Sequence, residues 1–132
     1  MSIFESAARM FGGGGPEAFK NISVDELAAM VAARKKMVIL DVREPAELAA
    51  FGAIKGVVNV SVRDLSERLN ELPSDKSTPI VVVCQTGSRS RSAARLLATR
   101  AGYTDVSNLE GGTMTWMRHG QPTVRVTPKN MR

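Results

Sequence analysis

The single cysteine of this 132-residue chain, Cys84, is the residue best suited to covalent chemistry. It follows the apolar run 79–83 and opens a polar loop, 84–90, with the sequence Cys-Gln-Thr-Gly-Ser-Arg-Ser. A helix N-terminus and nearby cations lower the pKa of a thiol, and Gly87 lets the backbone curl so that successive N–H groups form a nest for an anion. We therefore predict that Cys84 is a nucleophile. The residues predicted to bind the anion are Gln85, Thr86, Gly87, Ser88, Arg89 and Ser90.

Structural roles are the alternative interpretation of these residues. A buried cysteine often serves as a small hydrophobic side chain, but a structural cysteine does not require the polar loop that follows it. Arg89 lies inside the loop and is interpreted as functional, whereas Arg91 and Arg95 are expected to extend into solvent. The only histidine, His119, is expected to interact favourably with a helix end rather than to activate the thiol. One cysteine and one histidine also disfavour a clustered metal site.

Composition excludes several classes of protein. Hydrophobic residues make up 43% of the chain and charged residues 23%, as in an ordinary globular domain. The net charge of +5 favours encounters with anions, but one tryptophan and one tyrosine offer little stacking surface, so nucleic-acid binding is not expected. No segment approaches the roughly 20 apolar residues of a membrane span, and no secretory signal is evident. A lone thiol persists most easily in a reducing compartment, so we expect a cytoplasmic protein.

Three segments are predicted along the chain: a flexible Gly-rich leader over 1–21, one ordered domain over 22–120 and a basic tail over 121–132. Hydrophobic periodicity within the domain predicts strands alternating with helices. The predicted strands are 37–40, 57–60, 79–83 and 105–109. The predicted helices are 24–34, 45–51, one over 61–72 with Val62, Leu65, Leu69 and Leu72 on one face, one after the loop that ends at Gly102, and 113–119.

Alternating strands and helices with short connections indicate an α/β fold with a mostly parallel sheet. Ligands of such sheets bind beyond the carboxyl ends of the strands. Asp41 and Cys84 both stand at predicted strand ends, so they are expected to share one site.

Three separated segments together resemble the rhodanese (thiosulfate sulfurtransferase-like) domains. They are Asp41-Val-Arg-Glu-Pro45 with the following Gly52, Ile54-Lys-Gly56 and Asn59; the loop 84–90; and Leu109-Glu-Gly-Gly112 with Trp116. The match covers about residues 22–120. The resemblance implies a parallel sheet of about five strands with helices on both faces. It also implies that Cys84 accepts a sulfane sulfur as a persulfide and passes it to a thiol or cyanide.

The resemblance also assigns roles to other residues. The loop N–H groups and Arg89 would hold a small anionic sulfur donor, such as thiosulfate or a persulfide, and the acceptor would be a thiol. A protein donor or acceptor is a further candidate partner, and no cofactor is expected. Asp41 and Arg43 would support the loop from behind, although a local turn with an Asp41–Arg43 pair explains them equally well. Gly111, Gly112 and Trp116 are interpreted as structural.

Departures from the family pattern bear on the activity. Ala53 replaces a common histidine, which bears on the subfamily more than on the chemistry. Gln85 replaces an arginine found in several relatives, and the loss of this positive charge makes thiosulfate a poorer donor than a persulfide. A phosphatase or arsenate reductase of the same fold is an alternative, but such enzymes place five residues between cysteine and arginine, whereas Cys84 and Arg89 are separated by four. A noncatalytic rhodanese-like module that binds a partner is the second alternative.

Overall fold

The computed structural model of the chain describes residues 18–127, in which five strands form one sheet. The strand order is β1-β5-β4-β2-β3, and every pair of neighbours is parallel, as the sequence predicted. The strands are β1 (Lys20–Ile22), β2 (Val38–Asp41), β3 (Val58–Asn59), β4 (Ile80–Val83) and β5 (Val106–Leu109).

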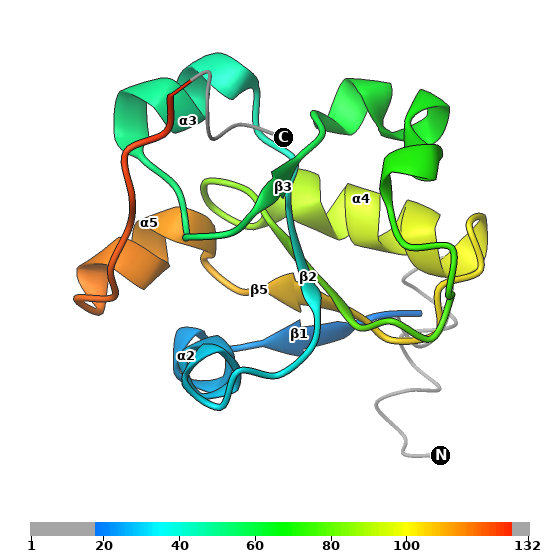
Figure 1. Cartoon of the computed structure of the whole chain (residues 1–132), viewed down its shortest axis with the longest axis horizontal. Helices are drawn as coiled ribbons and strands as arrows, with labels where there is room; N and C mark the ends of the chain where they lie inside the picture. Colours follow the sequence, from blue (N-terminus) through cyan, green and yellow to red (C-terminus); the bar gives the residue numbers. More distant parts are fainter. Residues whose placement is uncertain (1–17, 128–132) are drawn as a thin grey trace, which may run out of the picture.

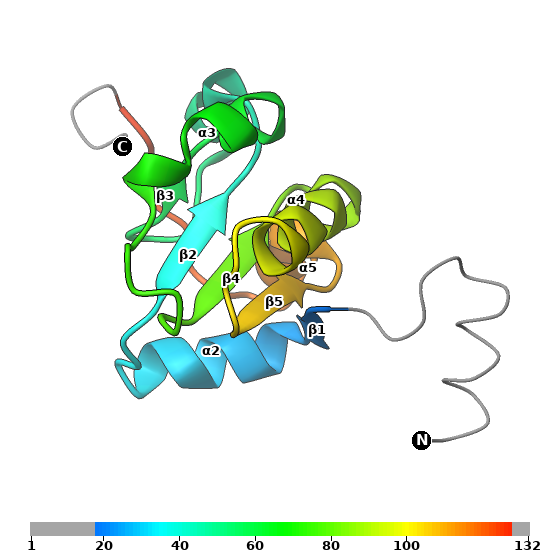
Figure 2. The same ribbon diagram turned by 90° about the vertical axis from the view of Figure 1, so that its right-hand side faces the viewer.

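Helices lie on both faces of this sheet, which confirms the predicted architecture (Figures 1 and 2). The described helical segments are α2 (Val24–Ala32), α3 (Pro45–Phe51), α4 (Ser88–Thr99), α5 (Gly112–Arg118) and the 3₁₀ segments η1 (Val62–Glu67) and η2 (Leu69–Glu71). Figure 2 shows α4 on one side of β4 and β5 and α2 on the other.

The central strand β4 separates two hydrophobic cores because successive side chains of a strand point to opposite faces. Ile80 and Val82 pack into the core under α4 and η1, whereas Val81 and Val83 pack into the core under α2 and α5. All four side chains are buried. This burial explains why the strand is apolar throughout, as parallel strands covered on both faces usually are.

Capping residues set the starts of α2 and α3. The hydroxyl of Ser23 accepts the backbone N–H of Glu26 at 3.1 Å, and the Glu26 carboxylate accepts the N–H of Ser23 at 3.2 Å, which is the predicted capping box. Pro45 occupies the first turn of α3, where its missing N–H leaves no hydrogen bond unmade. The predicted ranges 24–34 and 45–51 therefore agree with α2 and α3 to within two residues.

The prediction of a single helix over residues 61–72 is wrong. The segment instead forms η1 and η2, which are separated at Arg68, where φ is −120°. The apolar residues of each half are spaced by three, Val62 with Leu65 and Leu69 with Leu72, and this spacing matches a 3₁₀ helix with three residues per turn. Both pairs still pack against the core that contains α4. The apolar face was predicted correctly, but the helix type was not.

The predicted leader boundary at residue 21 also requires correction. Residues 20–22 form the edge strand β1, whose register pairs Lys20 with Ser107 and Ile22 with Leu109. Phe19 is buried in the core beside α4. Without the pairing to β5, a three-residue strand has too little periodicity to be recognised in the sequence. The rest of the predicted leader, residues 1–17, lies outside the described residues, as do residues 128–132 of the predicted tail.

The described part of the predicted tail runs from α5 to α3 along one side of the molecule (Figure 1). Val124 and Ala53 form an antiparallel bridge with hydrogen bonds of 3.0 and 2.7 Å. The indole N–H of the buried Trp116 donates to the carbonyl of Pro122 at 2.8 Å. Residues 121–127 therefore cover the junction between α5 and α3, next to the carboxyl end of the sheet.

Candidate functional site

The loop 84–90 leaves the sheet at the carboxyl end of β4 and enters α4 at Ser88. Asp41 at the end of β2 lies in register with Val83, and the N–H of Val42 donates to the Val83 carbonyl at 3.0 Å. The ends of the two strands therefore meet at one edge, as expected for ligand sites in parallel sheets. The two predicted groups of site residues, around Asp41 and around Cys84, are brought together there.

Cys84 is fully buried at the centre of this edge. Its sulfur accepts the backbone N–H of Gly87 at 3.0 Å and lies 3.3 Å from the hydroxyl oxygen of Ser90. Burial raises the pKa of the thiol. A hydrogen bond from the Ser90 hydroxyl, when that hydroxyl donates to the sulfur, and hydrogen bonds from the N–H groups of Ser90, Gly87 and Thr86 act together in the opposite direction and prevail. The net pKa of Cys84 lies below its ordinary value, which favours a nucleophilic thiolate.

The backbone of the loop curls because Gly87 adopts a left-handed conformation with φ of 107° immediately before α4. This turn aims the Gly87 N–H at the sulfur, and the N–H of Ser90, in the first turn of α4, is also directed at it. Thr86 and Ser88 are exposed on the outer side of the loop, and Gln85 and Arg89 are half-buried. The N–H groups of Thr86, Gly87 and Ser90 therefore lie against the cysteine sulfur. That this loop binds an external anion stays a prediction.

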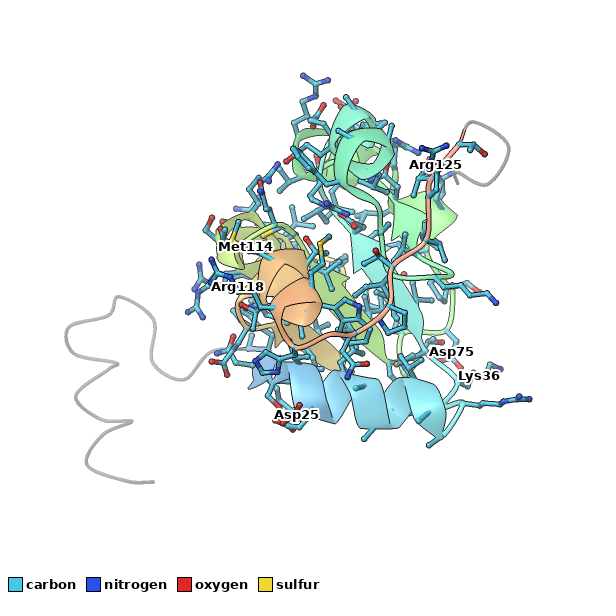
Figure 3. The ribbon with its side chains drawn as sticks, turned by 90° about the vertical axis from the view of Figure 1, so that its left-hand side faces the viewer. Asp25, Lys36, Asp75, Met114, Arg118 and Arg125 are labelled. Atoms are coloured by element: carbon cyan, nitrogen blue, oxygen red, sulfur yellow. The ribbon has the colours of Figure 1, made fainter. Side chains whose placement is uncertain are left out.

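The start of α5 packs directly against the loop. The N–H of Thr113 donates to the carbonyl of Cys84 at 2.8 Å, and the N–H of Met114 donates to that of Gln85 at 3.0 Å. Gly112 has a φ of 63°, and a Cβ there would lie 2.4 Å from both carbonyl oxygens. No side chain fits between the two segments, so the interpretation of Gly112 as a structural residue is supported. Figure 3 shows Met114 and Arg118 on the outward side of α5.

Arg89 makes a contact that the sequence did not reveal. Its two terminal nitrogens bind the carboxylate oxygens of Glu47 on α3 at 2.8 and 2.9 Å. The side-chain hydrogen bond to Arg89 is the main cause that lowers the pKa of Glu47 to about 2. Glu47 lies 42 residues from Arg89 in the chain, and no local pattern links a glutamate in the first turn of one helix to an arginine in another.

Asp41 and Arg43 form a buried ion pair behind the loop. The Asp41 carboxylate accepts Nε and Nη2 of Arg43, with a shortest distance of 2.8 Å, and Nη2 also donates to the carbonyl of Gly52. The amide of Asn59 donates to the carbonyls of Asp41 and Arg43 at 2.9 Å. The local pairing anticipated from the sequence is therefore confirmed. The pair also joins the end of β2 to the end of α3, which carries Glu47.

His119 and Arg91, which lie outside the loop, each contact a polar side chain of another element. His119 lies 3.7 Å from the carboxylate of Asp25, at the start of α2. Arg91 does not simply extend into solvent, because it donates to the side-chain oxygen of Asn21 on β1 at 3.2 Å.

Within residues 18–127, no group of three or more histidine, cysteine, aspartate or glutamate side chains is arranged to hold a metal ion. The helices of that same range are too short or too polar to cross a membrane.

Comparison with known proteins decides the family. The model of the rhodanese-like domain matches residues 23–119, which include the loop, the ion pair and the Gly111-Gly112 turn. The chain belongs to the rhodanese-like family. A protein of Allochromatium vinosum named sulfurtransferase is 34% identical over 103 residues, covering 78% of this chain and 92% of that protein. The thiosulfate sulfurtransferase GlpE of Shewanella oneidensis is 35% identical over 98 residues, covering 74% and 92%.

A solved structure agrees with the fold of this rhodanese-like chain. A rhodanese-related protein from Thermoplasma volcanium superposes with a TM-score of 0.72 at 31% identity, covering 82% of this chain and all of that one. Both of these relatives are named as sulfurtransferases.

Replacing Gly112 by alanine is expected to disrupt the rhodanese loop. The added Cβ meets two backbone carbonyls, so we expect Gly112→Ala to lose more than about 3 kcal/mol of unfolding free energy. Gly120→Ala is the matched control, because Gly120 has a φ of 75° but no atom within 4 Å of the added Cβ. The left-handed backbone alone should cost Gly120→Ala about 1 kcal/mol. Urea unfolding measures both, and equal losses would contradict the steric account.

The Arg89–Glu47 pair is expected to make stability depend on acid pH. Because the pKa of Glu47 falls from 4.5 to about 2 on folding, its contribution is complete above pH 4.5 and disappears as the pH falls towards 2. Glu47→Gln should therefore be less stable than the wild type by about 1 kcal/mol at neutral pH, since the pair is partly solvent-screened. Urea midpoints should converge between those pH values. Glu67→Gln, at an exposed site, is the control, and a difference that persists at pH 2 would contradict the assignment.

Proposed function

We propose that this protein is a sulfurtransferase that moves a sulfane sulfur from a small anionic donor to a thiol or cyanide acceptor through a persulfide on Cys84. The observation that carries this proposal is the sulfur of Cys84 in the backbone nest, with the Gly87 N–H 3.0 Å away. Such N–H groups stabilise a negatively charged sulfur without a metal or cofactor.

The first half-reaction is nucleophilic attack by the Cys84 thiolate on the outer sulfur of the donor. A bond forms between the two sulfurs, and the donor's sulfur–sulfur bond breaks. With thiosulfate, sulfite leaves with the bonding electron pair; with a persulfide, a thiolate leaves. Cys84 then carries a terminal sulfur with one negative charge, close to the N–H groups of Thr86, Gly87 and Ser90.

In the second half-reaction the acceptor thiolate attacks the terminal sulfur. A new sulfur–sulfur bond forms on the acceptor, and the Cys84 thiolate departs with the electron pair of the bond that breaks. The same N–H groups that lower the pKa of Cys84 make it a good leaving group, because they stabilise the thiolate in both half-reactions. The covalent intermediate implies ping-pong kinetics.

Arg89 would help to bind the anionic donor through its positive charge, at the edge of the loop. Its positive charge interacts favourably with the Cys84 thiolate, and its side chain is partly exposed to solvent. Glu47 neutralises part of that charge and holds the guanidinium in place. Gln85, Thr86, Gly87, Ser88 and Ser90 would contribute through their backbone N–H groups, and Asp41 with Arg43 would support the strand end behind them.

The donor and the location follow from charge and redox chemistry. The Arg89–Glu47 pair is neutral overall and Gln85 adds no charge, which favours a singly charged persulfide over the doubly charged thiosulfate. A small-molecule or protein persulfide would serve equally, with a low-molecular-weight thiol as acceptor. A cysteine that reacts as a thiolate is easily oxidised, so this chemistry requires a reducing compartment. We therefore propose that the protein acts in the cytoplasm.

The loop length supports sulfur rather than phosphate as the transferred group. Only four residues separate Cys84 from Arg89, and the N–H of Gly87 already contacts the cysteine sulfur directly. A loop closed on one sulfur atom leaves less room for a tetrahedral oxyanion than the longer loops of the phosphatases. Glu47 also occupies both terminal nitrogens of Arg89, which a phosphate would otherwise engage as a bidentate pair.

Intact-mass measurement tests the proposal directly. After incubation with thiosulfate or glutathione persulfide, the wild-type chain should gain the mass of one sulfur atom, and added glutathione or cyanide should remove it. Cys84→Ser should gain nothing, because Cys84 is the only cysteine in the chain.

A control variant and a rival assay complete this test. Ser92→Ala changes an exposed residue of α4 outside the loop 84–90, so this variant should still gain the sulfur. The proposal fails if the wild type gains no sulfur from either donor, which would favour a noncatalytic binding module. Turnover of an aryl phosphate without sulfur uptake would favour a phosphatase instead.

A further inference from the structure

A chain of side-chain hydrogen bonds connects the buried sulfur of Cys84 to the surface. The hydroxyl of Ser90 lies 3.3 Å from the sulfur and donates to the side-chain oxygen of Asn108 on β5. The amide nitrogen of Asn108 donates to the side-chain oxygen of Asn21 on β1 at 3.0 Å. Arg91 on α4 donates to that same oxygen at 3.2 Å.

Arg91 determines the direction of every bond in this chain. A guanidinium only donates hydrogen bonds, so the Asn21 atom that faces it must be the oxygen. The Asn108 atom that faces this oxygen must then be the amide nitrogen, which turns the Asn108 oxygen towards Ser90. Two acceptors cannot face each other at hydrogen-bond distance without a shared proton, so the Ser90 hydroxyl must donate to Asn108.

Ser90 therefore has no proton left for the sulfur in this arrangement. A hydroxyl carries one proton, and the carbonyl of Gly87, 3.1 Å away, is a second acceptor that competes for it. The lone pairs of Ser90 are left to face Cys84, so the protonated thiol donates to Ser90. To stabilise a thiolate, Ser90 must turn its O–H to the sulfur and leave the Asn108 oxygen without its donor.

We propose that Arg91, Asn21 and Asn108 are positioning residues that orient the Ser90 hydroxyl away from the sulfur and so hold the resting Cys84 partly in its protonated form. This relay, the hydrogen-bonded series Arg91–Asn21–Asn108–Ser90, opposes the effect of the backbone N–H groups of Gly87 and Thr86, which favour the thiolate. Its consequence is a smaller thiolate fraction at rest, which limits oxidation of the only cysteine in the chain. The inference rests on the proposed role of Cys84 as the sulfur acceptor.

The other charged groups at the site do not replace this relay. Arg89 on α4 lies close enough to interact with the thiolate, and its charge is balanced by Glu47 on α3. Asp41 and Arg43, at the end of β2, neutralise each other as a buried pair. Substitution of Asn21 alters none of these groups, because Asn21 lies exposed on the edge strand β1.

Two variants of Asn21 test the relay. Asn21→Ala removes the oxygen that orients Asn108, so the Asn108 amide is free to rotate and present its nitrogen to Ser90, whose O–H then turns to the sulfur. We expect the thiolate pKa to fall by about half a unit, a fraction of one hydrogen bond to a charged group. Asn21→Asp keeps an oxygen that accepts from both Arg91 and Asn108, so the pKa should not fall.

The measurement is the far-ultraviolet absorbance of the thiolate as a function of pH, in which Cys84→Ser supplies the baseline. A fall in Asn21→Ala but not in Asn21→Asp supports the relay, and any other combination overturns it. Lys20→Ala, at the neighbouring position of β1, controls for damage to the edge strand, since Lys20 pairs with Asp105 outside the relay. The titration requires no turnover, so it remains decisive even if Cys84 accepts no sulfur from the donors tested above.

Discussion

The close approach of Gly112 to the backbone carbonyls of Cys84 and Gln85 is the constraint on which the site depends. Because no Cβ stands between them, α5 can donate two hydrogen bonds to those carbonyls and fix the first turn of the loop. With their carbonyls turned towards α5, the N–H groups that follow are free to surround the sulfur. The packing of Trp116 into the core holds α5 in the position that this contact requires.

The chemistry of Cys84 results from a competition between burial and hydrogen bonding. Removal from water opposes the thiolate, whereas the Ser90 hydroxyl, when it donates to the sulfur, and the backbone N–H groups of the loop together favour it more strongly. Neither contribution needs a cation in direct contact with the sulfur. Arg89, the residue that the sequence suggested for that role, is shared with Glu47, and its positive charge is largely neutralised. Hydrogen bonds from the loop and from Ser90, rather than a charged side chain, are therefore the main source of thiolate stabilisation.

Patterns that are local in the chain were predictable, and long-range pairings were not. The apolar β4, the glycine turn after Cys84 and the capping box at Ser23 all leave a periodic or positional signal within a few residues. Glu47, Asn108 and Asn21 leave none, because each acts through a partner brought close only by the sheet. The edge strand β1 was missed for the same reason: its three residues owe their conformation to β5.

The most direct test of the account is a crystal structure of the protein after reaction with a persulfide donor. The account predicts a second sulfur atom bonded to Sγ of Cys84, within hydrogen-bond distance of the backbone N–H groups of the loop, with the Glu47–Arg89 pair intact. An unmodified Cys84 with an oxyanion centred in the loop, and Arg89 turned from Glu47 to bind it, would contradict the account.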